Sequence, residues 1–450
     1  MAIISRDKKF YKSLFSLAGV IAVQNLVVFS VNLADNIMIG RWSELSLSAV
    51  AICNQIQFLL QMIVTGAAGG LVVIASQYWG KKDIQPIKKL TSAAFLIGIG
   101  MTLALMLFAM FWPREALGLL TNDAEVIAEG MKYLRIMVWS YVVFGITNIL
   151  IGALRAVETV NIGFYVSIGA LVVNVTLNYA LIYGHLGFDA MGIEGAAIAT
   201  LISRVFELAV VGVYTFCIDK KLRLRILDIF SVSAGYLRDF VRSGLPIVLS
   251  NTSWGIAMSV QTAILGRLGQ MVISSNSIAT TIFQVIIVVS SGLASAVGVV
   301  IGKTVGEGRQ EDAKTYAKTL QILFLCVGIL SSLALFAARK PIIGIYGVSG
   351  DTAAMSNTFI LILCVTIIGS CYQMPALTGI VSGGGETKFV LFNDIIFQWM
   401  IVIPASALSA FIFGFPPAVT FACLKSDQIL KCFVAVVKVN RFRWIRVLTK

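Results

Sequence analysis

The sequence predicts an all-α, multi-pass membrane protein with twelve transmembrane helices, arranged as two six-helix lobes related by pseudo-two-fold symmetry. Of the 450 residues, 58% are hydrophobic and 13% are charged, whereas a soluble domain carries about 25% charged residues. The hydrophobic residues fall in runs of about 20, the length of helix that crosses a bilayer. A repeat of the first half of the chain in the second half divides these runs into two sets of six.

Twelve apolar runs are expected to span the membrane, and the longest of them must tilt or project beyond it. The first run, from Leu14 to Leu33, has no small-residue cleavage site and continues into Asp35. It is therefore expected to be a span and not a signal peptide. In chain order the predicted spans are residues 14–40, 46–78, 91–112, 132–155, 161–183, 192–218, 240–267, 272–302, 317–337, 355–382, 388–413 and 417–438.

The distribution of basic residues predicts the orientation of the chain. Most of the 35 Lys and Arg residues lie in the N-terminal segment, in every second loop and in the C-terminal tail, and such residues remain on the cytoplasmic side. Both termini are therefore expected in the cytoplasm, with the protein in the plasma membrane (inner membrane) of a bacterial cell. The net charge of +13 follows from this pattern and does not indicate nucleic acid. The expected partners are the lipid bilayer and small molecules, and the protein is expected to be a monomer.

An internal repeat becomes visible when the two halves of the chain are superposed. The shift that places Asn25 over Asn251 also places Gly66 over Gly292. Each half holds an even number of predicted spans, so the repeats run parallel and are related by an axis along the membrane normal. Such lobes enclose a central cavity and suit transport by alternating access.

The longest charged connection lies near the midpoint of the chain, between Asp219 and Arg242. It predicts three parts: an N-terminal lobe (1–218), a cytoplasmic linker (219–239) and a C-terminal lobe (240–450) that ends in a basic cytoplasmic tail.

The sequence contains no constellation that indicates an enzyme. The segment AVGVVIGKT resembles the end of a phosphate-binding loop, but that motif needs a glycine five residues before Gly302, where Val297 stands. The only histidine, His185, lies in an external loop, so a catalytic triad is not expected. The seven cysteines lie in or beside apolar runs without CxxC spacing, which argues against a disulfide framework or a zinc site. No cofactor is expected other than a coupling ion.

Asp35, in the apolar stretch VNLADNIMIG, is the main candidate functional residue. A carboxylate at the centre of a membrane helix costs about 2.5–3.5 kcal/mol on insertion scales, so it is a functional-site hypothesis by default. Its counterpart at the repeat shift is Gln261, so only one lobe carries the acid. We expect Asp35 to bind and release a coupling cation, either Na⁺ or H⁺.

Two later segments supply possible partners for Asp35. Asn174 and Asn178 are four residues apart in ALVVNVTLNYALIYG and share one helix face. Thr200 follows the small residues of EGAAIAT, which allow close approach of helices. These oxygens and the carboxylate form a possible ligand set for Na⁺, or the carboxylate carries a proton instead. The alternative for the asparagines is hydrogen bonding between helices.

Several motifs resemble the multidrug and toxic compound extrusion (MATE) family over essentially the whole chain. They are LADNIMIG, QYWG, NVTLNYALIYG, GIEGAAIAT and GGGETKF. The resemblance implies export of drugs coupled to cation entry, with an N-lobe ion site that corresponds to Asp35, Asn174, Asn178 and Thr200.

The chain also departs from what the resemblance implies. Many members have a proline in the first span, whereas this chain has Val20, which lies opposite Pro246 at the repeat shift. Some members carry acids in spans 7 and 10, where this chain has Gln261 and Tyr372–Gln373, so no second ion site is expected in the C-terminal lobe. Some have an acid at the position of Asn178, which would leave Asp35 as the only titrating group of its cluster.

Two further charged groups have simpler interpretations. Asp394 lies near the cytoplasmic start of span 11 and is expected to cap a helix or face water. Arg204 and Glu207, three residues apart in span 6, are expected to form an ion pair within one helix.

The expected function is secondary active efflux of amphipathic and cationic drugs by antiport with Na⁺ or H⁺. Amide and aromatic side chains suit such substrates, although each could instead hydrogen-bond between helices. The alternative is a flippase for lipid-linked oligosaccharides or polysaccharides, which would need a cavity rich in Arg and Lys. The substrate cavity is expected to be lined by Asn25, Asn148, Asn251, Trp254, Gln261, Gln284, Tyr372 and Gln373.

Overall fold

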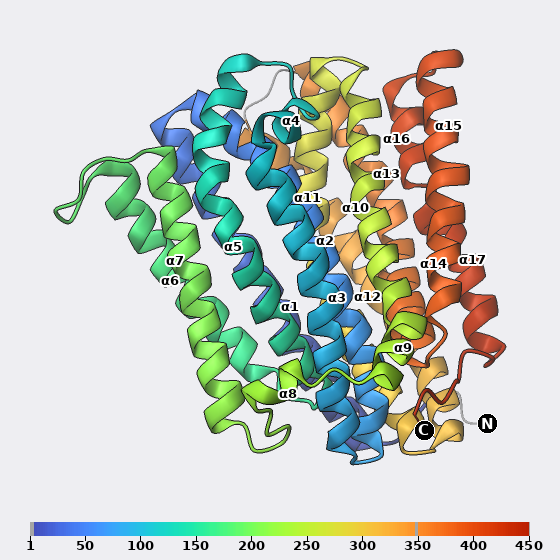
Figure 1. The fold of residues 1–450 in the computed structure, drawn as a ribbon. Helices are drawn as coiled ribbons and strands as arrows, with labels where there is room; N and C mark the ends of the chain where they lie inside the picture. The colour runs from blue at the N-terminus through green and yellow to red at the C-terminus, as the bar shows by residue number, and fades with distance from the viewer. Residues whose placement is uncertain (1–3, 347–349, 450) are drawn as a thin grey trace. The chain divides into compact units, whose positions relative to one another are not determined.

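A computed structural model of the chain describes residues 4–346 and 350–449, and all regular structure within these ranges is helical (Figure 1). The fold class predicted from the sequence is confirmed. Ten helices of the described part are long and apolar enough to cross a membrane. Predicted spans 7 and 12 are not among these ten. Span 7 corresponds to α10, which carries several amide and hydroxyl side chains, and span 12 corresponds to the two short helices α16 and α17.

The chain forms two compact units. The N-terminal unit comprises residues 23–252, and the C-terminal unit comprises residues 1–22 with 253–450. These limits lie inside α1 and α10 and not at residues 219–239, so the predicted division into lobes at that linker stays a prediction.

The N-terminal unit holds most of α1 (Lys8–Trp42) and the first turns of α10 (Leu245–Gly266). Between them lie α2 (Glu44–Gly80), α3 (Ile84–Phe111), α4 (Pro113–Gly118), α5 (Ala124–Ala156), α6 (Asn161–Tyr183), α7 (Ile193–Val213), the π-helical η1 (Tyr214–Ile218), α8 (Ile226–Phe230) and α9 (Ala234–Ser243). The predicted linker therefore contains two short helices.

The C-terminal unit contains the start of α1 and the rest of α10, followed by a second set of helices. These are α11 (Gln270–Gly306), α12 (Gln310–Tyr346), α13 (Gly350–Met374), η2 (Pro375–Val381), α14 (Thr387–Ile395), η3 (Ile396–Val402), α15 (Ile403–Ala407), η4 (Leu408–Ile412), α16 (Pro417–Lys425) and α17 (Asp427–Asn440). Three π-helical segments, η2 to η4, interrupt the α-helices here, and such segments often occur at functional sites.

Local sequence determines where the long helices begin and end. Asp123 begins α5, because its carboxylate accepts hydrogen bonds from the backbone N–H groups of Glu125 (2.9 Å) and Val126 (3.2 Å). Gly184 ends α6 with a φ of 74°, and a side chain there would also meet the backbone of Ala190. The apolar runs between such ends are helical, and a helix satisfies its backbone hydrogen bonds within its own segment, as a bilayer requires.

The predicted linker is attached to α3. Lys88 Nζ lies 3.0 Å from Asp228 Oδ2 and 2.6 Å from the carbonyl oxygen of Arg223. Burial acts to raise the pKa of Asp228, but the Arg225 N–H and the Lys88 ammonium hold it below its usual value.

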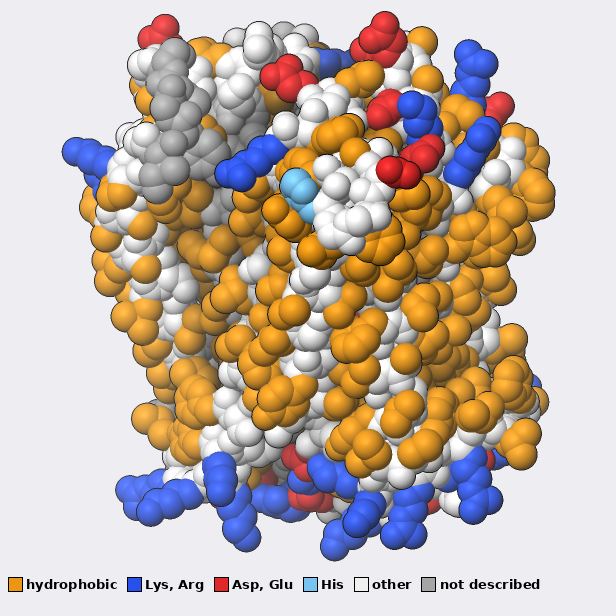
Figure 2. All heavy atoms as spheres, turned by 90° about the vertical axis from the view of Figure 1, so that its left-hand side faces the viewer, with side chains coloured by type: hydrophobic (Ala, Val, Ile, Leu, Met, Phe, Trp, Pro, Cys, Tyr) orange, Lys and Arg blue, Asp and Glu red, His pale blue; other side chains and the backbone are white. Residues whose placement is uncertain are grey.

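The surface has the character expected for contact with lipid. Figure 2 shows one face on which hydrophobic side chains form a broad band, with Lys and Arg side chains gathered along one edge of it. Charged side chains of both signs occupy the opposite edge.

Candidate ion-binding site

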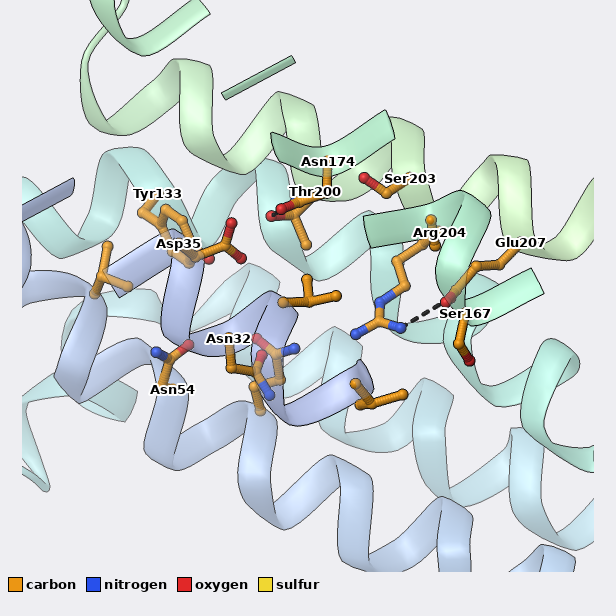
Figure 3. Close-up of a pocket in the computed structure, with 15 residues that line it drawn as sticks. Asn32, Asp35, Asn54, Tyr133, Ser167, Asn174, Thr200, Ser203, Arg204 and Glu207 are labelled. Atoms are coloured by element: carbon orange, nitrogen blue, oxygen red, sulfur yellow. Dashed lines mark hydrogen bonds and ion pairs between the residues drawn. The ribbon is translucent and has the colours of Figure 1, made fainter. Parts of the chain in front are cut away.

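A small polar cavity lies inside the N-terminal unit (Figure 3). On the four helices that contribute more than one lining residue, these residues recur at spacings of three, four or seven, so each of these helices presents one face to the cavity. The lining residues are Val28, Val31, Asn32 and Asp35 of α1; Val50, Asn54 and Gln57 of α2; Tyr133 of α5; Ser167, Ala170 and Asn174 of α6; and Thr200, Ser203, Arg204 and Glu207 of α7.

Glycines bring these helices close together. A Cβ atom on Gly195 of α7 would lie 2.6 Å from the carbonyl oxygen of Leu181 in α6. A Cβ atom on Gly163 of α6 would lie 2.9 Å from the side-chain amide of Gln24 in α1. The close approach expected from the small residues before Thr200 is confirmed at Gly195.

The four residues predicted to form the ion site are joined in one chain of hydrogen bonds. Asn178 Nδ2 donates to Asp35 Oδ1 and, at 3.2 Å, to Asn174 Oδ1. Asn174 Nδ2 donates to Thr200 Oγ1 at 3.5 Å, and Thr200 in turn donates to the carbonyl oxygen of Ala196 at 3.0 Å. The structure therefore brings together side chains from α1, α6 and α7 that the sequence separates by up to 165 positions.

One atom of this group has no partner. Asn178 is fully buried, and its Oδ1 atom accepts no hydrogen bond. A buried polar atom without a partner is costly, and an amide oxygen beside a carboxylate is a good ligand for a hard cation. The arrangement has the chemistry of a cation site, although Asn178 must rotate to turn its oxygen toward Asp35.

The cavity is large enough for an ion but too small for a drug. Its volume is about 20 Å³, compared with the roughly 10–15 Å³ needed for one water molecule. A cation or a water molecule fits beside Asp35, whereas a drug does not.

Sequence reasoning missed part of this site. Arg204 and Glu207 form the predicted ion pair, with Nη1 and Oε2 2.8 Å apart, but they line the same cavity as Asp35. Asp35 is the only carboxylate among the four predicted residues, but Glu207 is a second carboxylate in the same cavity. The signal was present, because Thr200, Arg204 and Glu207 are four and seven residues apart and share one face of α7.

The residues predicted to line a substrate cavity divide between the two units. Asn25, Asn148 and Asn251 belong to the N-terminal unit, and the other predicted lining residues, Trp254, Gln261, Gln284, Tyr372 and Gln373, belong to the C-terminal unit.

Several of these side chains bond within their own unit. Asn148 and Asn251 donate to carbonyl oxygens of their own helices, both at 2.9 Å. The Tyr372 hydroxyl donates to Gln321 at 2.8 Å, and the amide of Gln373 donates to Gln428 at 3.0 Å. The substrate cavity stays a prediction.

The expectation for Asp394 is corrected by the structure. Asp394 does not simply face water, because its Oδ1 lies 2.8 Å from Lys431 Nζ. Lys431 also lies 3.6 Å from Asp427 Oδ2 and is only 3% exposed. Lys431, which lies within the predicted span 417–438, is thus a buried residue of α17, where pairing offsets the cost of burial.

The fold and the buried polar cavity are those of a multi-pass helical membrane protein of the transporter class. The MatE family model matches residues 21–180 and 246–408. The chain belongs to this family, the MATE family that its motifs resemble, and it is a membrane transporter and not an enzyme. The two matched segments begin at residues 21 and 246. The separation between these two starting residues is close to the repeat shift that places Asn25 over Asn251.

Relatives and solved structures agree with this assignment. An uncharacterized transporter of Bacillus subtilis, YisQ, is 24% identical over 436 residues, which cover 94% of this chain and 92% of the relative. The multidrug resistance protein PmpM of Pseudomonas aeruginosa is 25% identical, with 87% and 82% covered.

Two solved structures share the fold. A transporter of the MOP superfamily from Pyrococcus furiosus superposes with a TM-score of 0.87 at 18% identity, with 98% of this chain and 97% of that chain covered. The Vibrio cholerae MATE transporter VcmN in its bent form gives 0.85 at 17% identity, with 98% and 99% covered.

Proposed function

We propose that the protein exports amphipathic and cationic organic compounds across the bacterial inner membrane in exchange for Na⁺ or H⁺. The observation that carries this proposal is the position of Asp35: a carboxylate inside a membrane helix, hydrogen-bonded to Asn178 and facing a cavity that holds only an ion or a water molecule. The names of relatives such as PmpM, a multidrug resistance protein, support the class of substrate.

In this scheme Asp35, Asn174, Asn178 and Thr200 bind the coupling ion. The drug occupies a separate cavity lined by the amide and aromatic residues predicted from the sequence, including Trp254. Ion binding and drug binding then favour opposite orientations of the two lobes, which is what antiport by alternating access requires.

The orientation follows the positive-inside rule. The basic edge of the face in Figure 2 is then the cytoplasmic one, and the basic residues of the N-terminal segment and the C-terminal tail support a cytoplasmic location for both termini. The protein functions as a monomer, because each chain contains both lobes.

The test is dye efflux from proteoliposomes that carry either an imposed Na⁺ gradient or an imposed H⁺ gradient. Wild-type protein should respond to at least one gradient, and Asp35→Asn should insert normally but lose the response. Undiminished gradient-driven efflux by Asp35→Asn would refute the proposal. Transport of a lipid-linked anion without dye efflux would instead favour the flippase predicted as the alternative, although the only basic residue that lines the described cavity, Arg204, is already paired.

A further inference from the structure

The cavity that holds Asp35 has an unbalanced set of charges. Three of the described residues that line it are ionisable at neutral pH: Asp35, Glu207 and Arg204. The guanidinium of arginine stays protonated in proteins. With both carboxylates ionised the cavity carries a net charge of −1, so one additional monovalent cation neutralises it.

Arg204 is placed to serve either carboxylate. Its Nη1 lies 2.8 Å from Glu207 Oε2, and the two side chains are 11% and 8% exposed. Its guanidinium carbon lies 4.7 Å from the centre of the Phe144 ring, a flat support against which the group can turn. Figure 3 shows the guanidinium extending into the cavity, with Glu207 on one side and Asn32 and Asp35 toward the other.

The burial of Asp35 determines what must happen when its cation leaves. A carboxylate that loses its cation inside a protein is strongly destabilised unless another positive charge replaces it. Arg204 is the only positively charged residue among the described lining residues, and it lines the same cavity as Asp35. The guanidinium of Arg204 has five N–H donors in a fixed planar arrangement, so it can form well-aligned hydrogen bonds with either carboxylate.

We propose that Arg204 is an internal counter-ion that alternates between Glu207 and Asp35. When the coupling cation occupies Asp35, Arg204 pairs with Glu207, and when the cation leaves, Arg204 moves to Asp35. The site therefore takes one monovalent cation per cycle. This proposal rests on the proposed function, and it adds Arg204 and Glu207 as residues that determine the affinity of the site for the ion.

The two single variants at this pair should change ion dependence in opposite directions. Glu207→Gln leaves Arg204 free to neutralise Asp35 permanently, so the ion concentration that gives half-maximal efflux should rise about tenfold or more, the usual effect of a nearby charge. Arg204→Gln leaves two carboxylates without a counter-ion, so the same concentration should fall by about tenfold or more. The double variant restores a net charge of −1 and should lie within about threefold of the wild type.

The measurement is dye efflux from proteoliposomes at fixed dye concentration, as a function of whichever ion drives the wild type. The matched control is the ion pair Glu129–Lys132 of α5, also three residues apart, with 2.8 Å between charged atoms but outside the cavity. Glu129→Gln and Lys132→Gln should leave the ion dependence unchanged. If Glu207→Gln fails to fold, Glu207→Asp, with its shorter reach toward Arg204, should give a smaller rise.

One outcome would overturn the exchange of Arg204 between Glu207 and Asp35 but leave the proposed function standing. In that outcome Asp35→Asn loses its ion dependence, whereas Glu207→Gln and Arg204→Gln keep the half-maximal ion concentration of the wild type. Shifts of both variants in the same direction would also overturn it, because they would indicate a structural role of the pair. Retained ion-driven efflux in Asp35→Asn would remove the proposed function itself.

Discussion

Gly66 of α2 and Val248 of α10 are in backbone contact: a Cβ atom on Gly66 would lie 2.6 Å from the Cα of Val248. The equivalent contact occurs in the other unit, where a Cβ atom on Gly292 of α11 would lie 2.8 Å from the backbone nitrogen of Ala22 in α1. The repeat shift that places Gly66 over Gly292 also places Ala22 over Val248. The repeat is therefore a repeat of helix packing as well as of sequence.

Substitution of either glycine by alanine should destabilise the protein. The added methyl group meets backbone atoms, which cannot move aside as a flexible side chain can, and overpacking of this kind costs about 1–3 kcal/mol. Thermal unfolding of purified Gly66→Ala and Gly292→Ala should show lower midpoints than the wild type. Gly100→Ala is the control, because a Cβ atom there meets nothing within 4 Å. It should be neutral or stabilising by up to about 1 kcal/mol, and equal behaviour of all three variants would contradict the packing role.

Val20 and Pro246 explain why α1 is continuous whereas its counterpart is broken. The repeat shift carries the first residue of α1, Lys8, onto Ala234, the first residue of α9. The counterpart of α1 is therefore the pair α9 and α10, interrupted at Gly244, two residues before Pro246. A proline lacks the N–H of the helix ladder and its ring clashes with the preceding turn, so the helix starts again at Leu245, where Pro246 is tolerated in the first turn.

Val20→Pro should break α1 in the same way. The change removes one backbone hydrogen bond and should lower the free energy of unfolding by about 3 kcal/mol. Hydrogen exchange followed by mass spectrometry should show faster exchange in the peptide around Ser16 to Val20, with little change in α9. Unchanged protection of that peptide would mean that Val20 is not what keeps α1 continuous.

Lys431 should be essential for the stability of the C-terminal unit. Lys431→Met leaves Asp394 and Asp427 without their shared ammonium group, and removal of one partner of a buried pair costs about 3–5 kcal/mol. Lys314→Met is the control, since Lys314 pairs with the exposed Glu311, and exposed pairs contribute about 0–1 kcal/mol. The thermal midpoint of Lys431→Met should fall well below that of Lys314→Met, and Asp394→Asn in the Lys431→Met background should recover part of the loss. Equal midpoints for the two lysine variants would contradict the assignment.

The fold was largely predictable because membrane helices are specified by local composition. Runs of apolar residues and the repeat are visible without any knowledge of long-range contacts, so all the long spans fall on helices. Lys431 shows the limit of this approach. Its charge resembles that of the basic tail around Arg441, and only the packing of α17 against the rest of its unit shows that it is buried.

The candidate site was predictable in part for a similar reason. Asp35 is conspicuous because a charge is costly in an apolar run, and Asn174 and Asn178 share a face. Glu207 was not recognised as a site residue, because its partner Arg204 lies on the same helix and offers a sufficient local explanation. The additional information is that α1 and α7 line one cavity, which depends on contacts between residues far apart in the sequence.

Asn178 provides the most direct test of whether the hydrogen-bonded group binds an ion or only holds helices together. Asn178→Ala removes both the donor to Asp35 and the unpartnered Oδ1 atom. If the amide is an ion ligand, the ion concentration for half-maximal efflux should rise about tenfold or more, as for loss of a group that orients a metal ligand. If it only joins helices, stability should fall by about 0.6 kcal/mol and ion dependence should not change. Asn276→Ala is the control, since Asn276 belongs to neither predicted site and its Oδ1 accepts a hydrogen bond from Thr280 in its own helix, α11, at 3.3 Å. Equal ion dependence of the two alanine variants in proteoliposomes would remove Asn178 from the ion site, whereas a shift confined to Asn178→Ala would place its amide beside the ion that Asp35 binds.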